Sequence, residues 1–205
     1  MGLSGEDVFM LKFIRSRYLH TTLLALGLNT SCLVQSAAPN QYTFTKNNNT
    51  NSSNATELKL LQNHFQQQRK LAGLSSKSIR VGDVVWSYNE GGSHSKPTIL
   101  LIHGLAGTRD NWNRVAQFLT QHYHVIIPDL PNSGDTKTPS HFDNSVPNVT
   151  SQLRQFIEAI DCEENLHVAG HSLGGSIATV YAAQYPFDTQ SLFLLNSAGI
   201  YKHAN

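Results

Sequence analysis

The chain has 205 residues, 40% of them apolar, which suffices for one domain with a buried core. Its 15 Lys and Arg residues nearly balance its 14 Asp and Glu residues, so the composition excludes the basic surface of a nucleic-acid-binding protein. The ten histidines and two cysteines show neither the spacing of a zinc motif nor a disulfide scaffold, so we expect no metal and no cofactor.

The amino-terminal leader (residues 1–38) is typical of an exported protein. Basic residues precede a short apolar run at 21–28, and small residues follow at 36–38. This is the layout of a secretory signal peptide, and the apolar run is too short to cross a membrane. Cys32 lies where a lipoprotein leader would carry its acylated cysteine, so the leader also allows membrane association. We expect a periplasmic, secreted or envelope-anchored protein.

Residues 39–56 form an Asn-rich polar tract, which we interpret as a flexible linker. Apolar residues at helical spacing predict a helix over 57–72, packed on the sheet or on a cap region. A β-hairpin follows, with strands at 78–81 and 84–88 around a Gly-Asp turn. We expect this hairpin to form the antiparallel edge of the sheet.

A strand buried on both faces is predicted at 98–102 because its residues form an apolar run. The run ends in the glycine-containing loop that begins His103-Gly104-Leu105, and a helix is predicted over 111–121. Glycine in this loop would let the backbone approach a substrate closely. We interpret His103 as a strand-end residue that orders the loop, and Trp112 as a core residue.

A second buried strand begins at His124 and runs into the turn-rich loop Pro128-Asp129-Leu130-Pro131. A helix is predicted over 146–160. Cys162 is interpreted as a half-buried structural thiol. The other histidines are interpreted as ordinary surface or loop residues: His20, His64, His94, His122, His124, His141, His167 and His203.

Residues 170–175 read Gly-His-Ser-Leu-Gly-Gly, between an apolar strand pattern and a helical pattern. A serine at such a strand-to-helix turn has a strained backbone, so the residues two positions away must be small, as Gly170 and Gly174 are. The turn presents the Ser172 hydroxyl above the sheet at a helix N-terminus, which predicts a nucleophile. His171 and Gly175 complete this turn. The alternative is a glycine-lined turn with a solvated serine.

A nucleophilic serine that attacks an ester generates an oxyanion, which requires two aimed hydrogen-bond donors. One donor is the backbone N–H of the residue after the nucleophile, here Leu173. The other comes from the loop after an earlier strand, and the N–H of Leu105 is the best candidate. The predicted oxyanion hole therefore consists of Leu105 and Leu173.

Alternating strands and helices indicate a mostly parallel sheet with helices on both faces. The strand ending in His-Gly, the strand ending in Pro-Asp-Leu and the serine turn occur in the order seen in the α/β-hydrolase superfamily. The chain resembles bacterial lipases and esterases of the His-Gly-X type over residues 78–203. This resemblance implies a carboxylic ester hydrolase that acts on acylglycerols or other small-molecule or lipid esters. The chain departs from the family at Asn132-Ser133-Gly134, where relatives usually carry Gly-His-Gly or a similar small triplet.

The resemblance also implies a catalytic acid and a histidine that follow the nucleophile in the chain. Asp188 and His203 are poor candidates, because both groups should follow two strands that residues 173–205 do not supply. We therefore expect the acid and the histidine beyond residue 205. The hydrolase domain (57–205) is then incomplete at its C-terminus and nearly inactive by itself.

Two other classes of function stay open. On the same scaffold, peptidase, C–C hydrolase, thioesterase or perhydrolase chemistry would use the same serine. A non-catalytic binding protein of the same fold, or a surface protein anchored through Cys32, would need no triad. The strained serine turn argues against the non-catalytic binding protein, because it costs stability without a structural benefit. The anchored surface protein rests on the leader alone.

Overall fold

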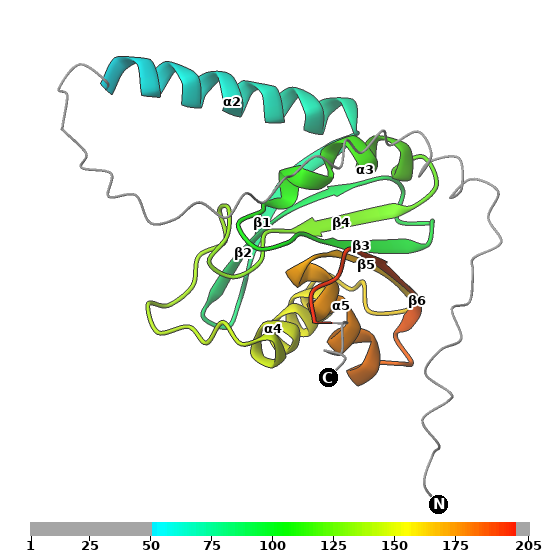
Figure 1. Ribbon diagram of the computed structural model, residues 1–205. Helices are drawn as coiled ribbons and strands as arrows, with labels where there is room; N and C mark the ends of the chain where they lie inside the picture. The colour runs from blue at the N-terminus through cyan, green and yellow to red at the C-terminus, as the bar shows by residue number, and fades with distance from the viewer. Residues whose placement is uncertain (1–50, 200–205) are drawn as a thin grey trace, which may run out of the picture.

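The computed structural model describes residues 51–199, and Figure 1 shows how they are arranged. The predicted leader, Cys32 and His203 lie outside the described residues. Within the described part of the chain, we find no helix with the length and apolar character that a membrane span requires.

Within residues 51–199, six strands form one mixed sheet in the order β1-β2-β4-β3-β5-β6. Their bounds are β1 Leu74–Val81, β2 Val84–Gly91, β3 Thr98–Ile102, β4 His124–Pro128, β5 Leu166–His171 and β6 Thr189–Leu195. The β1–β2 hairpin forms one edge and pairs antiparallel with β4, whereas β4, β3, β5 and β6 are parallel to one another. The predicted α/β sheet and its antiparallel hairpin are confirmed.

Helices cover both faces of the sheet. They are α2 Asn51–Leu71, the 3-10 helix η1 Arg109–Trp112, α3 Asn113–Leu119, α4 Val146–Ala159 and α5 Leu173–Gln184. Figure 1 shows α2 and α3 on one side of the sheet and α4 and α5 on the other. Parallel strands require this cover, because both of their faces are apolar.

Two hydrophobic clusters fill the spaces between the sheet and its helices. On the side of α4 and α5, Trp86 and Phe156 stack with ring centroids 4.8 Å apart. On the side of α3, Trp112 and Ala116 pack against the sheet, and Trp112 is buried as predicted. The sheet is therefore held from both sides, which fixes the ends of its strands.

Helix α2 differs from its prediction in two ways. It begins at Asn51 rather than at residue 57, and its apolar side is largely exposed, with Leu61 and Leu71 exposed by 50% and 64%. The reason is that α2 spans 21 residues, whereas α3, which it packs against, spans 7 and covers only part of it. An ion pair between Arg69 and Asp110 holds the covered part, with Nε to Oδ1 at 2.6 Å.

The prediction for His124 was wrong. It was expected at the surface or in a loop, but its side chain is buried, with an exposure of 1%. The reason lies in the strand order, because His124 is the first residue of β4, and β4 lies between β2 and β3.

Candidate active site

Ser172 occupies the junction between β5, which ends at His171, and α5, which begins at Leu173. Its backbone has φ 52° and ψ −119°, a conformation that residues with side chains rarely adopt. Its N–H donates to the Leu195 carbonyl at 3.1 Å, and its carbonyl accepts from the N–H groups of Gly175 at 2.9 Å and Ala198 at 3.0 Å. These bonds to β6, to α5 and to the segment after β6 hold the strained residue in place.

The glycines around Ser172 allow β5, β3 and α5 to approach closely. A Cβ on Gly170 would lie 2.5 Å from the Gly174 carbonyl carbon and 2.7 Å from the Gly175 nitrogen. A Cβ on Gly174 would lie 2.8 Å from the Ile102 carbonyl carbon. Small residues at 170 and 174 are therefore required by the backbone packing of the turn.

The loop after β3 lies against Ser172. A Cβ on Gly104 would be 3.1 Å from the Ser172 Cβ and 3.1 Å from Nδ1 of His171. A tight turn follows, in which the Gly107 N–H donates to the Gly104 carbonyl at 3.0 Å. The side chain of Leu105, inside this turn, is 81% exposed. The sheet thus brings the predicted loop and the predicted nucleophile together, although they lie almost 70 positions apart in the chain.

His103 ties two loops together from a buried position. The Leu130 N–H donates to His103 Nε2 at 3.0 Å, so the ring proton is on Nδ1 and is donated to the Gly104 carbonyl at 2.8 Å. Burial lowers the pKa of His103, although its bond to Gly104 and the charge of Asp129 oppose this shift. Both ring nitrogens are occupied, so His103 links the loop after β3 to the loop after β4.

A buried ion-pair network, which the sequence did not reveal, fixes the same two loops. The Arg109 N–H donates to Asp129 Oδ1 at 2.7 Å, and the Arg109 guanidinium pairs with Asp129 Oδ2. The same guanidinium reaches Asp135 Oδ2 at 2.5 Å, and the Asp135 N–H donates to Asp129 Oδ2 at 2.9 Å. Gly134 is required here, because its φ is +53° and a Cβ would overlap the Asp129 carboxylate. No local motif connects Arg109 to Asp129, so only the fold shows this contact.

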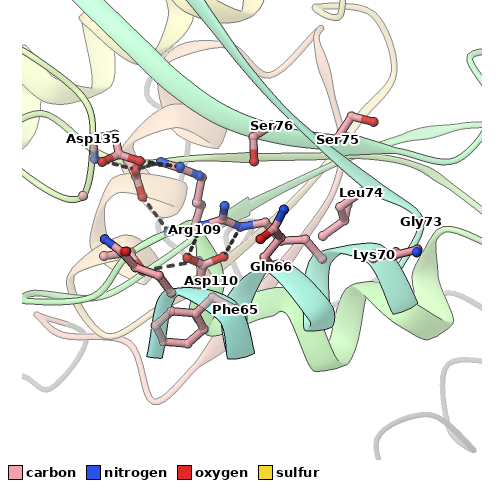
Figure 2. A pocket seen from close by; sticks show the side chains of 15 residues that line it. Phe65, Gln66, Lys70, Gly73, Leu74, Ser75, Ser76, Arg109, Asp110 and Asp135 are labelled. Carbon is pink, nitrogen blue, oxygen red and sulfur yellow. Dashed lines mark hydrogen bonds and ion pairs between the residues drawn. The ribbon is translucent and has the colours of Figure 1, made fainter. Parts of the chain in front are cut away.

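A cavity of about 1000 Å³ lies beside this network, between α2, β1 and the two loops. Figure 2 shows Arg109 and Asp135 on one side of it and Phe65, Gln66 and Lys70 from α2 on the other. Ser172 and Leu105 do not line it. This cavity is therefore distinct from the surroundings of the serine.

The described residues after Ser172 contain no histidine and only one acid, Asp188. The Asp188 carbonyl accepts from the Leu166 N–H at 2.7 Å, which places it at the start of β5, whereas Ser172 follows the end of that strand. Its carboxylate lies 3.2 Å from Arg154. Asp188 thus lies at the opposite end of the strands from Ser172 and does not reach it.

The backbone around the serine supplies donors for an anion. Leu173 is the first residue of α5, and the N–H groups of the first helical turn have no acceptor within the helix. The N-terminus of a helix also carries a partial positive charge. The arrangement can therefore present a hydroxyl and at least one main-chain donor to a carbonyl group.

Comparison with known proteins shows the family of the fold. Residues 97–204 match the family model of the alpha/beta hydrolase fold. The chain is 38% identical to Lipase 1 of Psychrobacter immobilis over 154 residues, which cover 74% of this chain and 48% of the relative. It is 32% identical to the monoacylglycerol lipase ABHD6 of Homo sapiens, covering 69% of this chain and 42% of the relative. The chain spans about half the length of the curated relatives it matches.

Solved structures show the same relationship. A candidate lipase from Acinetobacter baumannii AYE superposes with a TM-score of 0.69 at 55% identity, covering 82% of this chain and 51% of that structure. A membrane phospholipase A, described as a bacterial virulence factor, also superposes with a TM-score of 0.69, at 40% identity. It covers 72% of this chain and 47% of that structure.

Proposed function

We propose that this chain, which belongs to the α/β-hydrolase fold family, carries the nucleophile and the oxyanion-binding loops of a lipase or esterase. The observation that carries the proposal is Ser172, held at φ 52° between β5 and α5 with the Gly104 loop against it. A strained residue of this kind persists only where the surrounding structure enforces it, and such residues cluster at functional sites.

In this mechanism the Ser172 Oγ attacks the acyl carbonyl of an ester, and a histidine accepts the hydroxyl proton. The N–H groups of Leu105 and Leu173 stabilise the oxyanion of the tetrahedral intermediate. The intermediate collapses to an acyl-enzyme, and the alcohol leaves with the proton returned by the histidine. Water then attacks the acyl-enzyme, which releases the carboxylic acid and restores Ser172.

The histidine and its acid partner come from a part of the protein outside residues 51–199. Among the described residues after Ser172, Asp188 is the one acid, and it pairs with Arg154 at the far end of the strands. His103 is occupied by Gly104 and Leu130. This placement agrees with the chain order of the fold, in which the acid and the histidine follow the serine.

Lipid esters are the substrate class that we propose. The relatives named above act, by their names, as lipases, a monoacylglycerol lipase and a phospholipase A. On this chain, the exposed side chain of Leu105 adjoins the serine turn and offers an apolar contact to an acyl chain. Peptide, thioester and C–C substrates would use the same serine and are outcomes that the test distinguishes.

The test measures hydrolysis by the protein at its full natural length, with a monoacylglycerol, p-nitrophenyl butyrate, an acyl thioester, a peptide and a C–C hydrolase substrate compared side by side. Ser172→Ala should lower kcat at least about 10⁴-fold, because the nucleophile is lost. Ser176→Ala is the matched control. It removes a hydroxyl one helical turn further along α5, which donates to the Ala198 carbonyl at 2.6 Å, and should leave the rate within about twofold. Hydrolysis that survives Ser172→Ala, or a preference for thioesters or peptides, would overturn the proposal.

A further inference from the structure

Three side chains of types that can bind metals meet at the end of the sheet opposite to Ser172. Glu90 comes from the end of β2, His94 from the connection between β2 and β3, and His124 from the start of β4. Glu90 Oε1 lies 2.7 Å from His124 Nε2 and 3.3 Å from His94 Nε2. One ligand atom from each residue lies within 4.8 Å of the other two.

We propose that Glu90, His94 and His124 bind a zinc ion. Zinc takes imidazole nitrogen and carboxylate oxygen at about 2.0–2.2 Å in tetrahedral geometry, which separates neighbouring ligand atoms by about 3.3 Å. The Glu90–His94 distance has this value already, and the Glu90–His124 distance needs to open by about 0.6 Å. Three protein ligands leave a fourth position for water.

The two imidazole rings converge on one carboxylate oxygen. Both Nε2 atoms approach the same oxygen, Oε1, and the two rings lie with their centroids 4.2 Å apart. Lys77 already holds the other carboxylate oxygen, Oε2, so the two imidazole nitrogens and Oε1 form one group of three possible ligand atoms. The His94 side chain is 76% exposed, so a metal ion can reach the three ligand atoms from solvent.

Neighbouring side chains orient the ligands. The hydroxyl of Thr98 lies 3.3 Å from His124 Nδ1, so it can accept the Nδ1 proton and leave the Nε2 lone pair toward the site. Lys77 holds the outer oxygen of Glu90, Oε2, at 2.5 Å. Such second contacts are typical of metal sites, because they fix the tautomer and orientation of each ligand. The Cys162 thiol approaches Nδ1 of His124 at 3.9 Å, on the side away from Nε2, and is not a ligand.

The zinc would join the β2–β3 connection to the start of β4. Thr98 pairs with His124 across the sheet, and β5 runs from this level to its end at His171. At about 3.3 Å per residue, the site is roughly 20 Å from Ser172 along the strands. The zinc site is therefore independent of the proposed hydrolase chemistry.

The experiment titrates zinc into the protein at its full natural length, purified with a histidine-free tag and stripped with a chelator. Calorimetry should show one equivalent of Zn²⁺ bound, and Co²⁺ in its place should give the visible absorption of a tetrahedral site. His94→Ala should weaken binding more than about 100-fold, beyond the cost of losing a second contact. Thr98→Val should weaken it about tenfold, because the orienting bond to His124 is lost.

His141→Ala is the matched control, because His141 is an exposed histidine on the loop between β4 and α4. It should bind zinc like the wild type. His94→Ala keeps the buried Glu90–His124 contact, so it should fold normally, which circular dichroism can check. Zinc binding that is absent from the wild type, or that His94→Ala leaves unchanged, would overturn the proposal.

Discussion

The packing of the serine turn makes Gly170→Ala a severe test of the structure. The added Cβ would lie 2.5 Å from the Gly174 carbonyl carbon and 2.7 Å from the Gly175 nitrogen. Adding a methyl group to a tightly packed site costs about 1–3 kcal/mol. Here the atoms struck belong to the backbone of α5, which cannot move aside as a side chain does, so we expect a loss of about 3 kcal/mol in the free energy of unfolding.

Gly82→Ala is the matched control. Gly82 has a positive φ of +56°, but a Cβ there would meet nothing within 4 Å. Gly82→Ala should lower the free energy of unfolding by about 1 kcal/mol, because the only unfavourable effect is the left-handed backbone conformation of the alanine. Urea denaturation of the two full-length variants should therefore differ by about 2 kcal/mol. If Gly170→Ala is no less stable than Gly82→Ala, the close approach of β5 and α5 is wrong.

Three further predictions concern the loops around the serine. Asp129→Asn should lower the free energy of unfolding by about 3–5 kcal/mol, because it leaves Arg109 buried without its main partner. Asp135→Asn should lower it by less than about 1 kcal/mol, since the Asp135 side chain is 72% exposed. Equal losses for the two variants in urea denaturation would contradict this. Because burial lowers the pKa of His103, the unfolded chain binds more protons below its ordinary pKa of about 6.5. The free energy of unfolding should therefore fall from pH 7 to pH 5. Measured by urea denaturation at several pH values, this fall should be smaller for His103→Gln than for the wild type. An equal fall in both proteins would contradict the prediction. Leu105→Pro removes the proposed oxyanion donor and should lower kcat about 10²–10³-fold in the ester assay, while Leu105→Ala, which keeps the N–H, should retain most of kcat; equal losses would remove Leu105 from the mechanism.

The sequence predicted most of the sheet because its strands carry strong local signals. The central parallel strands β3 and β4 are short, mostly apolar runs, and burial on both faces produces such runs. Helix α2 was predicted less well, because its extent depends on what covers it. Its apolar residues have helical spacing, but the short α3 leaves Leu61 and Leu71 exposed, which no pattern within the helix indicates.

The candidate site likewise has a part that could be predicted from the sequence and a part that could not. The serine turn is one continuous segment, so its glycines and its strained residue could be read from neighbouring positions. The Arg109–Asp129 pair and the Glu90–His94–His124 cluster could not. Each joins residues from different elements, and their contact depends on β4 lying between β2 and β3. The histidines were accordingly interpreted as scattered, because sequence spacing does not show which strands are neighbours.

The most direct measurement of the central claim is covalent labelling of the full-length protein with a fluorophosphonate, followed by peptide mapping. Such a probe reacts with an activated serine and forms a stable phosphonyl ester on its oxygen. We expect one adduct, on the peptide that contains Ser172, and none in Ser172→Ala under the same conditions. An adduct on another serine, or equal labelling of the wild type and Ser172→Ala, would contradict the assignment of Ser172 as the nucleophile.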